Sequence, residues 1–166
     1  MLGLGIGIEH QDDTRLHVGM DHQGGIIFYL DGNGGGFICT AANVGTHVVW
    51  GCAGSVITGA DLPSLGAGAQ NTIDILAECT TADIAADLCR DLSLNGYSDW
   101  FLPSKNELDA MHSNLHEEGL GGFATNYHWS STEYNNYNAW SQHFGDGSQG
   151  YSGKINSLYV RAVRAF

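Results

Sequence analysis

The sequence predicts a single, loop-rich α+β domain, on three observations. Gly is abundant, at 24 residues, and Pro is scarce, at 2, a balance that favours an α+β or β fold over a helical bundle. Strand patterns stand near both ends of the chain, and helical patterns lie between them. The 166 residues are enough for one domain with a real core.

The charge balance narrows the range of partners. Only 14% of the residues are charged, so the surface must be made polar by Gly, Ser, Asn, Thr and Tyr. Asp and Glu number 18 against 6 Lys and Arg, and such an acidic surface repels phosphate backbones. No stretch approaches the roughly 20 apolar residues of a membrane helix. We therefore expect neither a nucleic-acid partner nor membrane insertion.

Residues 1–23 are interpreted as an N-terminal extension, and residues 24–166 as the domain. The first residues, MLGLGIGIEHQDD, lack a basic n-region and a long apolar core, so no signal peptide is predicted. Within the domain, Ile26–Leu30 is the first clear strand, and 31–36 is a Gly-rich turn. Phe37–Ala41 is the returning strand, and residues 42–70 are predicted as loop.

Two short helices follow the loop. Ile73, Leu76 and Ala77 share one face in the first, and Thr81 is a plausible N-cap for the second, which begins near Ile84.

A capping motif predicts a third helix. Ser104 and Glu107 have the spacing of a capping box, and Leu108 and Met111 then begin an apolar face. Gly119 is a natural stop for this helix.

After Gly122 the helical pattern gives way to strands at 129–132, 139–144 and 159–166. In the last strand Arg161 and Arg164 point to opposite sides, so at least one is expected to meet a carboxylate, with Asp99 and Glu133 as candidates. Four aromatic residues are expected to be mostly buried: Trp100, Trp129, Trp140 and Phe144.

The cysteines and histidines leave several alternatives. The four cysteines, Cys39, Cys52, Cys79 and Cys89, lack the close pairs of a zinc ribbon, and buried free thiols or a disulfide such as Cys52 with Cys79 both remain open. His112 and His116 have a zinc-compatible spacing, but HSNLH lacks the Glu of HExxH, which favours two surface histidines. The turn at Asp31 is short of carboxylates for calcium. No metal site and no cofactor are expected.

An ordered set of motifs carries a family resemblance. They are Leu94–Ser104 with Glu107-Leu108, Trp129–Glu133, Ala139-Trp140 with Phe144, Gly147, Gln149 and Lys154, and Val160–Phe166. This set resembles microbial and viral C-type-lectin-like domains related in fold to the formylglycine-generating enzyme, and is most similar to the variable proteins of diversity-generating retroelements. The similarity covers roughly 24–166. It implies two helical regions on a small antiparallel sheet, with the strand at 26–30 paired to the strand at 159–166.

The resemblance also implies a variable segment at about 127–159. In such systems mutated AAC codons yield Asn, Tyr, Ser, His, Gly, Asp, Ile or Leu but never Lys, Gln or Trp, and Trp140, Gln142, Gln149 and Lys154 stand at fixed-looking positions. The implied variable, ligand-binding residues are Tyr127, His128, Tyr134, Asn135, Asn136, Tyr137, Asn138, Ser141, His143, Gly145, Asp146, Ser148, Gly150, Tyr151, Ser152, Ile155, Asn156, Ser157, Leu158 and Tyr159.

The composition of this segment agrees with a binding surface. Tyr provides large, rigid contact area, while Ser, Gly and Asn provide adaptable hydrogen bonds. The hypothesis is therefore a non-enzymatic display protein, extracellular or on a cell or virion surface, that recognises a protein or glycan. The alternative is a structural or adhesion module without diversified binding. A hydrolase or oxidase is disfavoured, because the related oxidase uses a cysteine pair in the C-terminal part of its domain and here none follows Cys89.

Overall fold

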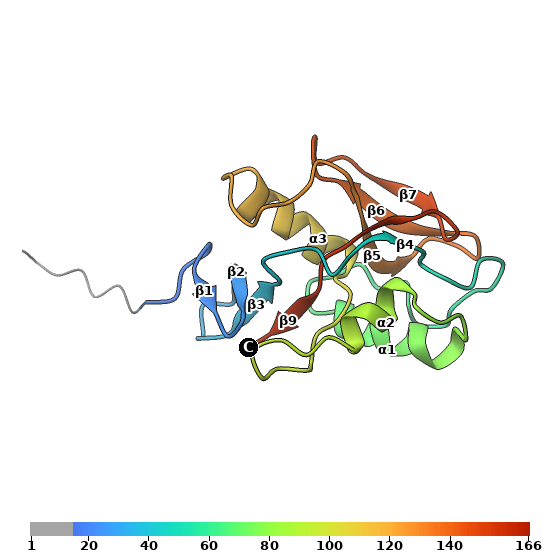
Figure 1. Cartoon of the computed structure of the whole chain (residues 1–166), viewed down its shortest axis with the longest axis horizontal. Coiled ribbons are helices and arrows are strands. Elements are labelled where there is room, and N and C mark those ends of the chain that lie inside the picture. The colour runs from blue at the N-terminus through green and yellow to red at the C-terminus, as the bar shows by residue number, and fades with distance from the viewer. Residues whose placement is uncertain (1–14) are drawn as a thin grey trace, which may run out of the picture.

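The computed structural model describes residues 15–166, which form two sheets flanked by short helices (Figure 1). One sheet has the order β1-β2-β3-β9 and the other the order β4-β8-β5-β6-β7. Every paired neighbour is antiparallel except β5 and β8. The predicted α+β class is confirmed, but the structure has two sheets where one small sheet was predicted. No helix in the described part of the chain has the length and apolar character to cross a bilayer.

The predicted N-terminal hairpin is confirmed as β2 (Gly25–Leu30) and β3 (Gly36–Cys39). Its turn is closed by Asp31, whose Oδ1 accepts the amides of Asn33 and Gly35 at 2.7 and 3.0 Å. A short strand, β1 (Asp21–His22), pairs with the outer edge of β2. The predicted extension, residues 1–23, thus joins the sheet at its described end, while residues 1–14 lie outside the described residues.

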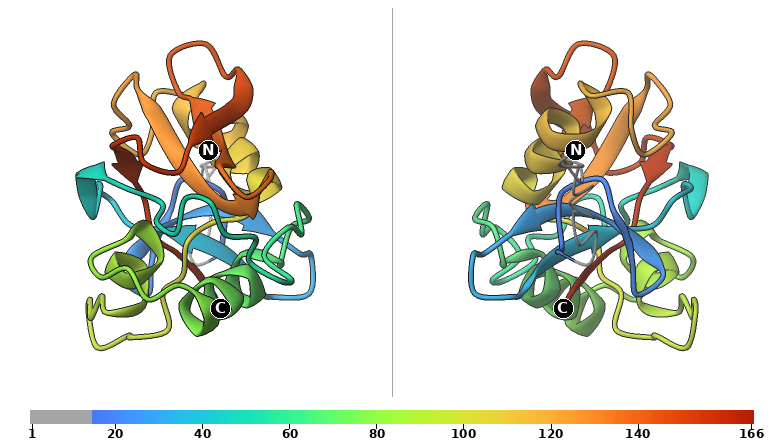
Figure 2. Two further views of the ribbon diagram at one scale, coloured as in Figure 1. Left: turned by 90° about the vertical axis from the view of Figure 1, so that its right-hand side faces the viewer. Right: turned by 90° about the vertical axis from the view of Figure 1, so that its left-hand side faces the viewer.

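The C-terminal strand corrects the predicted pairing. It is divided into β8 (Leu158–Val160) and β9 (Val163–Ala165), which belong to different sheets. β9 pairs with β3 rather than with β2, because β1 and β3 already occupy both edges of β2. The division falls at Arg161, whose buried guanidinium donates to the carbonyls of Thr40 and Gly121 at 2.7 and 2.9 Å. Figure 2 shows the dark red end of the chain leaving one sheet for the other.

The helices form the two predicted regions. The first holds α1 (Gly68–Glu78) and α2 (Ala85–Arg90), which contact each other below the larger sheet in Figure 1. The N-cap of α2 is Ile84 rather than the predicted Thr81. Asp83 has a positive φ of 58°, so the helix can begin only after this residue. The amide of Ile84 then donates to the carboxylate of Asp87, which caps the first turn.

The second helical region confirms the capping box. α3 (Lys105–Met111) begins with the Glu107 amide donating to Ser104 Oγ at 3.2 Å and the Ser104 amide donating to Glu107 Oε2 at 2.7 Å. The buried Glu107 carboxylate also accepts the Gly66 amide at 2.8 Å, which ties the preceding loop to the helix. A π-helix, η1 (His112–His116), continues α3, and the chain turns away at Gly119, whose φ is +72°.

Two clusters of buried side chains fill the core. Trp50, Trp100 and Trp129 belong to the larger cluster, and Phe144 belongs to the one beneath α3. The predicted burial of Trp100, Trp129 and Phe144 is confirmed, but Trp140 is only half-buried. The indole of Trp129 donates to the carbonyl of Val48 at 2.8 Å, so its polar end is satisfied.

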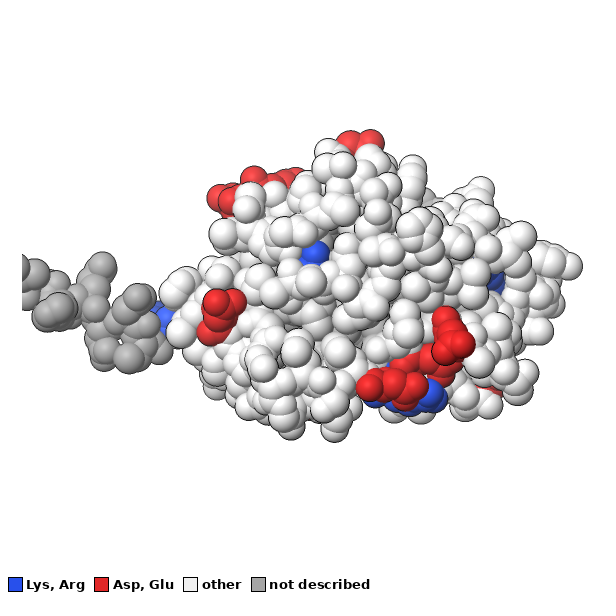
Figure 3. All heavy atoms as spheres, in the orientation of Figure 1, with Lys and Arg blue, Asp and Glu red and all other residues white. Residues whose placement is uncertain are grey.

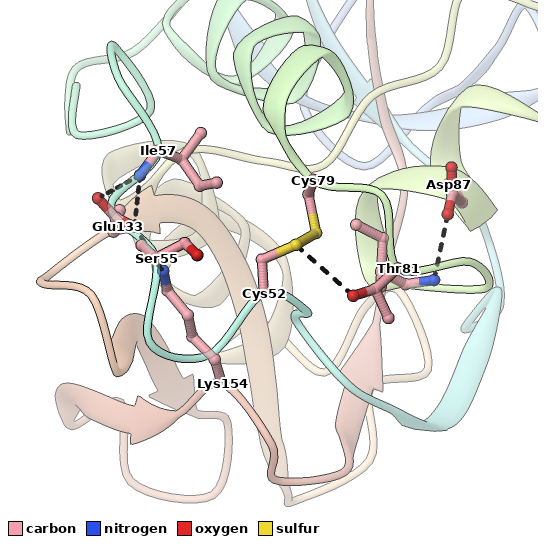
Figure 4. The surroundings of a disulfide bond; sticks show 9 residues. Cys52, Ser55, Ile57, Cys79, Thr81, Asp87, Glu133 and Lys154 are labelled. Carbon is pink, nitrogen blue, oxygen red and sulfur yellow. Dashed lines mark hydrogen bonds and ion pairs between the residues drawn. A yellow bond between two sulfur atoms is a disulfide. The ribbon is translucent and has the colours of Figure 1, made fainter.

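Both alternatives that the sequence left open for the cysteines occur: two form a disulfide and two are free thiols. Cys52 and Cys79 form a disulfide that joins the loop before α1 to the end of that helix (Figure 4). Cys39 and Cys89 are free and buried. Burial raises the pKa of the Cys39 thiol to about 12 and the pKa of the Cys89 thiol further still, so both stay protonated.

Candidate ligand-binding surface

Three antiparallel strands carry most of the predicted variable segment: β5 (Tyr127–Glu133), β6 (Asn138–His143) and β7 (Gln149–Gly153). They lie at the upper end of the molecule in Figures 1 and 2, away from the N-terminal hairpin. The remaining strand of this sheet, β4 (Gly45–Val48), pairs with β8. Side chains alternate between the faces of β6, so Trp140 and His143 project to opposite sides.

The first group on this surface is a set of packed aromatic rings. Tyr134 and Tyr151 are stacked, with ring centroids 4.3 Å apart and planes 1° from parallel, and they are 47% and 56% exposed. Both meet the indole of Trp140 edge to face, at 5.4 and 6.4 Å. Lys105 places its Nζ 3.7 Å from the centroid of the same indole. We call these four residues the aromatic platform.

The second group lies at the other end of β6. The ring of Tyr127 packs 4.8 Å from that of His143, whose Nδ1 lies 3.0 Å from Asp146 Oδ1. The Ser148 hydroxyl donates to the same oxygen at 2.7 Å. Hydrogen bonds from the hydroxyl and amide of Ser148, with the His143 contact, lower the pKa of Asp146 to about 2. The predicted single cluster of variable side chains is therefore two groups, divided by the alternation of β6.

A pair of loops extends the aromatic platform. Tyr137, 61% exposed, lies in the β5–β6 turn, where Asn135 Oδ1 accepts the amides of Tyr137 and Asn138, each at 2.9 Å. Ile155, 74% exposed, lies in the loop after β7. The Asn136 carbonyl accepts the amide of Gly54 at 2.8 Å, so the turn also rests on the loop that bears the disulfide.

A buried ion pair supports these loops from below (Figure 4). Lys154, with no exposed surface, donates to Glu133 and to the carbonyl of Ser55 at 2.9 Å. Glu133 accepts the amide of Ile57 at 3.0 Å, and the Lys154 amide donates to the carbonyl of Tyr137 at 2.9 Å. Lys154 is therefore a scaffold residue, as the sequence indicated.

Two residues of the predicted binding set do not lie at the surface, because they are buried. His128, with no exposed surface, packs 4.4 Å from the ring of Phe144, and burial lowers its pKa to about 4. Ser141 is 2% exposed, and its Oγ lies 2.9 Å from Ser152 Oγ. Both residues belong to strands that have a partner strand on each side, which the sequence did not reveal.

The other predicted residues reach the surface to different degrees. The exposed ones are Tyr127, Tyr134, Asn135, Tyr137, Gly145, Asp146, Ser148, Tyr151, Ile155, Asn156 and Ser157. The partly buried ones are Asn136, Asn138, His143, Gly150, Ser152, Leu158 and Tyr159.

Sequence reasoning missed two members of the platform. Trp140 was expected in the core, but it is half-buried and stands beside Tyr151. Lys105 belongs to the capping motif of α3, and nothing in that motif indicates that the start of the helix lies beside β6 and β7. The one sequence signal for this platform is that residues 134, 140 and 151 are all aromatic.

The predicted surface histidines are also corrected. His112 is buried and His116 half-buried, with rings 5.2 Å apart, because both pack against the ring of Phe144. Burial and the neighbouring His112 lower the pKa of His116. Over residues 15–166, no three His, Cys, Asp or Glu side chains are grouped as a metal would require.

The fold and this surface define a C-type-lectin-like α+β domain that presents an aromatic-rich face on three of its strands. The model of the Lcl C-terminal domain family matches residues 40–164, which is most of the chain. The chain therefore belongs to this family of C-type-lectin-like domains, which is associated with the variable proteins of diversity-generating retroelements. A search of curated proteins finds no match.

Proposed function

We propose that the chain is a non-enzymatic display domain whose surface at residues 127–159 binds a protein or glycan target. One observation carries the proposal. Over residues 15–166, every exposed Tyr, Trp or Phe side chain lies in this segment, namely Tyr127, Tyr134, Tyr137 and Tyr151. Tyrosine is large, has few rotatable bonds and is amphipathic, and aromatic anchors carry much of the energy of binding surfaces.

The support beneath the surface agrees with this role. The loops that carry Tyr137 and Ile155 are held by main-chain hydrogen bonds and by the Lys154–Glu133 pair, and one exposed side chain, that of Asn135, also holds the β5–β6 turn. The exposed tyrosines and Ile155 can therefore vary while the backbone beneath them stays in place, which is the arrangement that binding loops on a rigid scaffold require.

A location outside the cytosol is part of the proposal. The Cys52–Cys79 disulfide supports it, because disulfides form and persist in oxidising surroundings such as the exterior of a cell or virion.

Binding without catalysis is proposed on chemical grounds. The free thiols, Cys39 and Cys89, are buried, and their raised pKa values keep them as poor nucleophiles. Asp146 and His143 form a hydrogen-bonded pair, but the hydroxyl of Ser148 donates to Asp146 and is not placed to be activated by the imidazole.

The test is a triple variant. Tyr134→Ala, Tyr137→Ala and Tyr151→Ala together should abolish binding to peptides selected from a phage-displayed library, or to sugars of a glycan array, while unfolding stays nearly unchanged. The matched control alters three exposed apolar residues outside the segment: Leu62→Ala, Leu65→Ala and Ile73→Ala.

The proposal fails if the triple variant binds as well as the unaltered protein, or if no probe binds. Sequencing the gene from many individuals gives a second test. A display protein would vary at the implied codons, whereas a structural module would hold them constant.

A further inference from the structure

We infer that Lys105 and Trp140 form an invariant anchor in the binding surface, and that this anchor binds a carboxylate of an acidic segment on a protein ligand. The inference rests on the proposed function and adds the chemistry of the target. It concerns two residues of which one, Lys105, lies outside the predicted variable segment and the other, Trp140, was expected in the core.

The backbone of Lys105 is fixed at the start of α3. Its amide donates to Thr132 Oγ1 at 3.0 Å, and its carbonyl accepts from Gln149 Nε2 at 2.9 Å. These two bonds join α3 to β5 and β7, so the side chain leaves the helix at a defined place between them. From there the ammonium reaches the face of the Trp140 indole, a contact that holds a cation by its attraction to the ring.

The charge of Lys105 is not neutralised by the domain. Over residues 15–166, no carboxylate oxygen lies within ion-pair distance of its Nζ, and Asp109, one turn along α3, accepts from Gln142 instead. Most of the other cations are already paired with groups of the domain itself: Arg90, Lys154, Arg161 and Arg164. On the face drawn in Figure 3, red acidic atoms form several patches, whereas blue atoms are few and one group of them lies against a red patch.

The neighbours of Lys105 define the ligand group that fits. A single ammonium projects beside the rings of Trp140, Tyr134 and Tyr151. A carboxylate can accept a charge-assisted hydrogen bond from the ammonium, while the apolar part of the same segment packs on the tyrosines. A ligand without a hydrogen-bond acceptor would remove water from the ammonium and leave its charge unpaired, which weakens binding. Charge complementarity thus favours an acidic segment of a protein.

The residue types of the anchor differ from those around it in whether a mutated AAC codon can encode them. Lys and Trp are among the types that mutated AAC codons cannot yield, whereas Tyr134, Tyr137 and Tyr151 are of types that they can. Variation in the tyrosines would change the shape that surrounds the anchor without removing its charge. Different variants of this scaffold would then recognise different epitopes that share one acidic residue.

The experiment pans a phage-displayed library of random peptides against the disulfide-bonded chain. We expect the selected peptides to be enriched in Asp or Glu next to an aromatic or aliphatic residue. Lys105→Gln should weaken their binding by about 10-fold or more, because it removes a charged hydrogen-bond donor. Lys105→Arg, which keeps the charge, should weaken it much less. Replacing the Asp or Glu of the peptide by Asn or Gln should weaken binding to the unaltered protein by the same factor. The same replacement should not weaken binding to the Lys105→Gln protein.

Each other outcome has a defined meaning. Peptides that need the tyrosines but show no acidic enrichment and no loss with Lys105→Gln overturn the anchor and leave the proposed function standing. Peptides that bind equally well to the triple tyrosine variant overturn the proposed function. Binding that depends on Lys105 but is found only for acidic sugars of a glycan array overturns the choice of a protein ligand. Equal unfolding of Lys105→Gln and the unaltered protein shows that the variant is folded.

Discussion

Lys154 buries its ammonium against the carboxylate of Glu133, and its own main-chain amide donates to the carbonyl of Tyr137. One residue thus joins the core of the domain to the loop that displays an exposed tyrosine. The ring of Trp50 lies 4.5 Å from the same ammonium and completes its surroundings. The pair is a buried support for the loop that carries this tyrosine.

Removing one partner of this pair should destabilise the domain strongly. Lys154→Met leaves the Glu133 carboxylate buried without its counter-charge, at a cost of about 3–5 kcal/mol in the free energy of unfolding. The matched control is Lys105→Met, which removes a lysine that is only partly buried and should change stability by less than about 1 kcal/mol. Urea unfolding measures both. Equal stability of the two variants would contradict the assigned role of Lys154.

The disulfide and the two free thiols predict how many thiols per chain react with a reagent such as DTNB. The native protein should react hardly at all, since Cys39 and Cys89 are buried with raised pKa values. Unfolding without reductant should expose two thiols, and unfolding after reduction should expose all four. Four reactive thiols in the unfolded, unreduced protein would exclude the Cys52–Cys79 bond.

The features that sequence predicted well are local ones. The capping box needs only Ser104 and Glu107, which lie three residues apart, and the hairpin needs only the Gly-rich turn after Leu30. In both cases the residue types and their spacing are sufficient, because the hydrogen bonds that define the feature close within the motif itself.

The features that sequence missed depend on distant partners. The division between β8 and β9 follows from Arg161, whose acceptors belong to Thr40 and Gly121. His128 looked variable by type, but the placement of its strand between β8 and β6 buries it. Similarly, the aromatic platform exists because the start of α3 lies beside β7, a contact made through Gln149. Spacing along the chain carries none of this information.

His128 predicts a loss of stability on acidification. Its pKa is lowered to about 4 in the folded protein, chiefly by burial, whereas an unfolded chain has a value near 6.5. Between these values the unfolded state binds a proton that the folded state does not, so stability falls as pH falls from about 6.5 to 4. The slope reaches about 1.4 kcal/mol per pH unit, and above pH 6.5 this group adds no dependence. Urea unfolding at a series of pH values measures it.

The control for this prediction is His128→Gln, which keeps hydrogen-bonding capacity and removes the titration. Its pH dependence should be shallower than that of the unaltered protein over the same range. The lowered pKa of His116 acts in the same direction and remains in the variant, so some slope should persist. Identical slopes in the two proteins would show that His128 does not titrate as assigned.

Tryptophan fluorescence should report the charge on the aromatic platform. Trp50, Trp100 and Trp129 are buried, so Trp140 is the indole that a dissolved quencher can reach. The ammonium 3.7 Å from its ring attracts iodide and repels caesium. Iodide should therefore quench the unaltered protein more than Lys105→Gln, and caesium should quench it less. Neutral acrylamide should act equally on both, which shows that access to the ring is unchanged. An iodide-to-caesium ratio that is the same in both proteins would mean that the charge of Lys105 does not act at this surface.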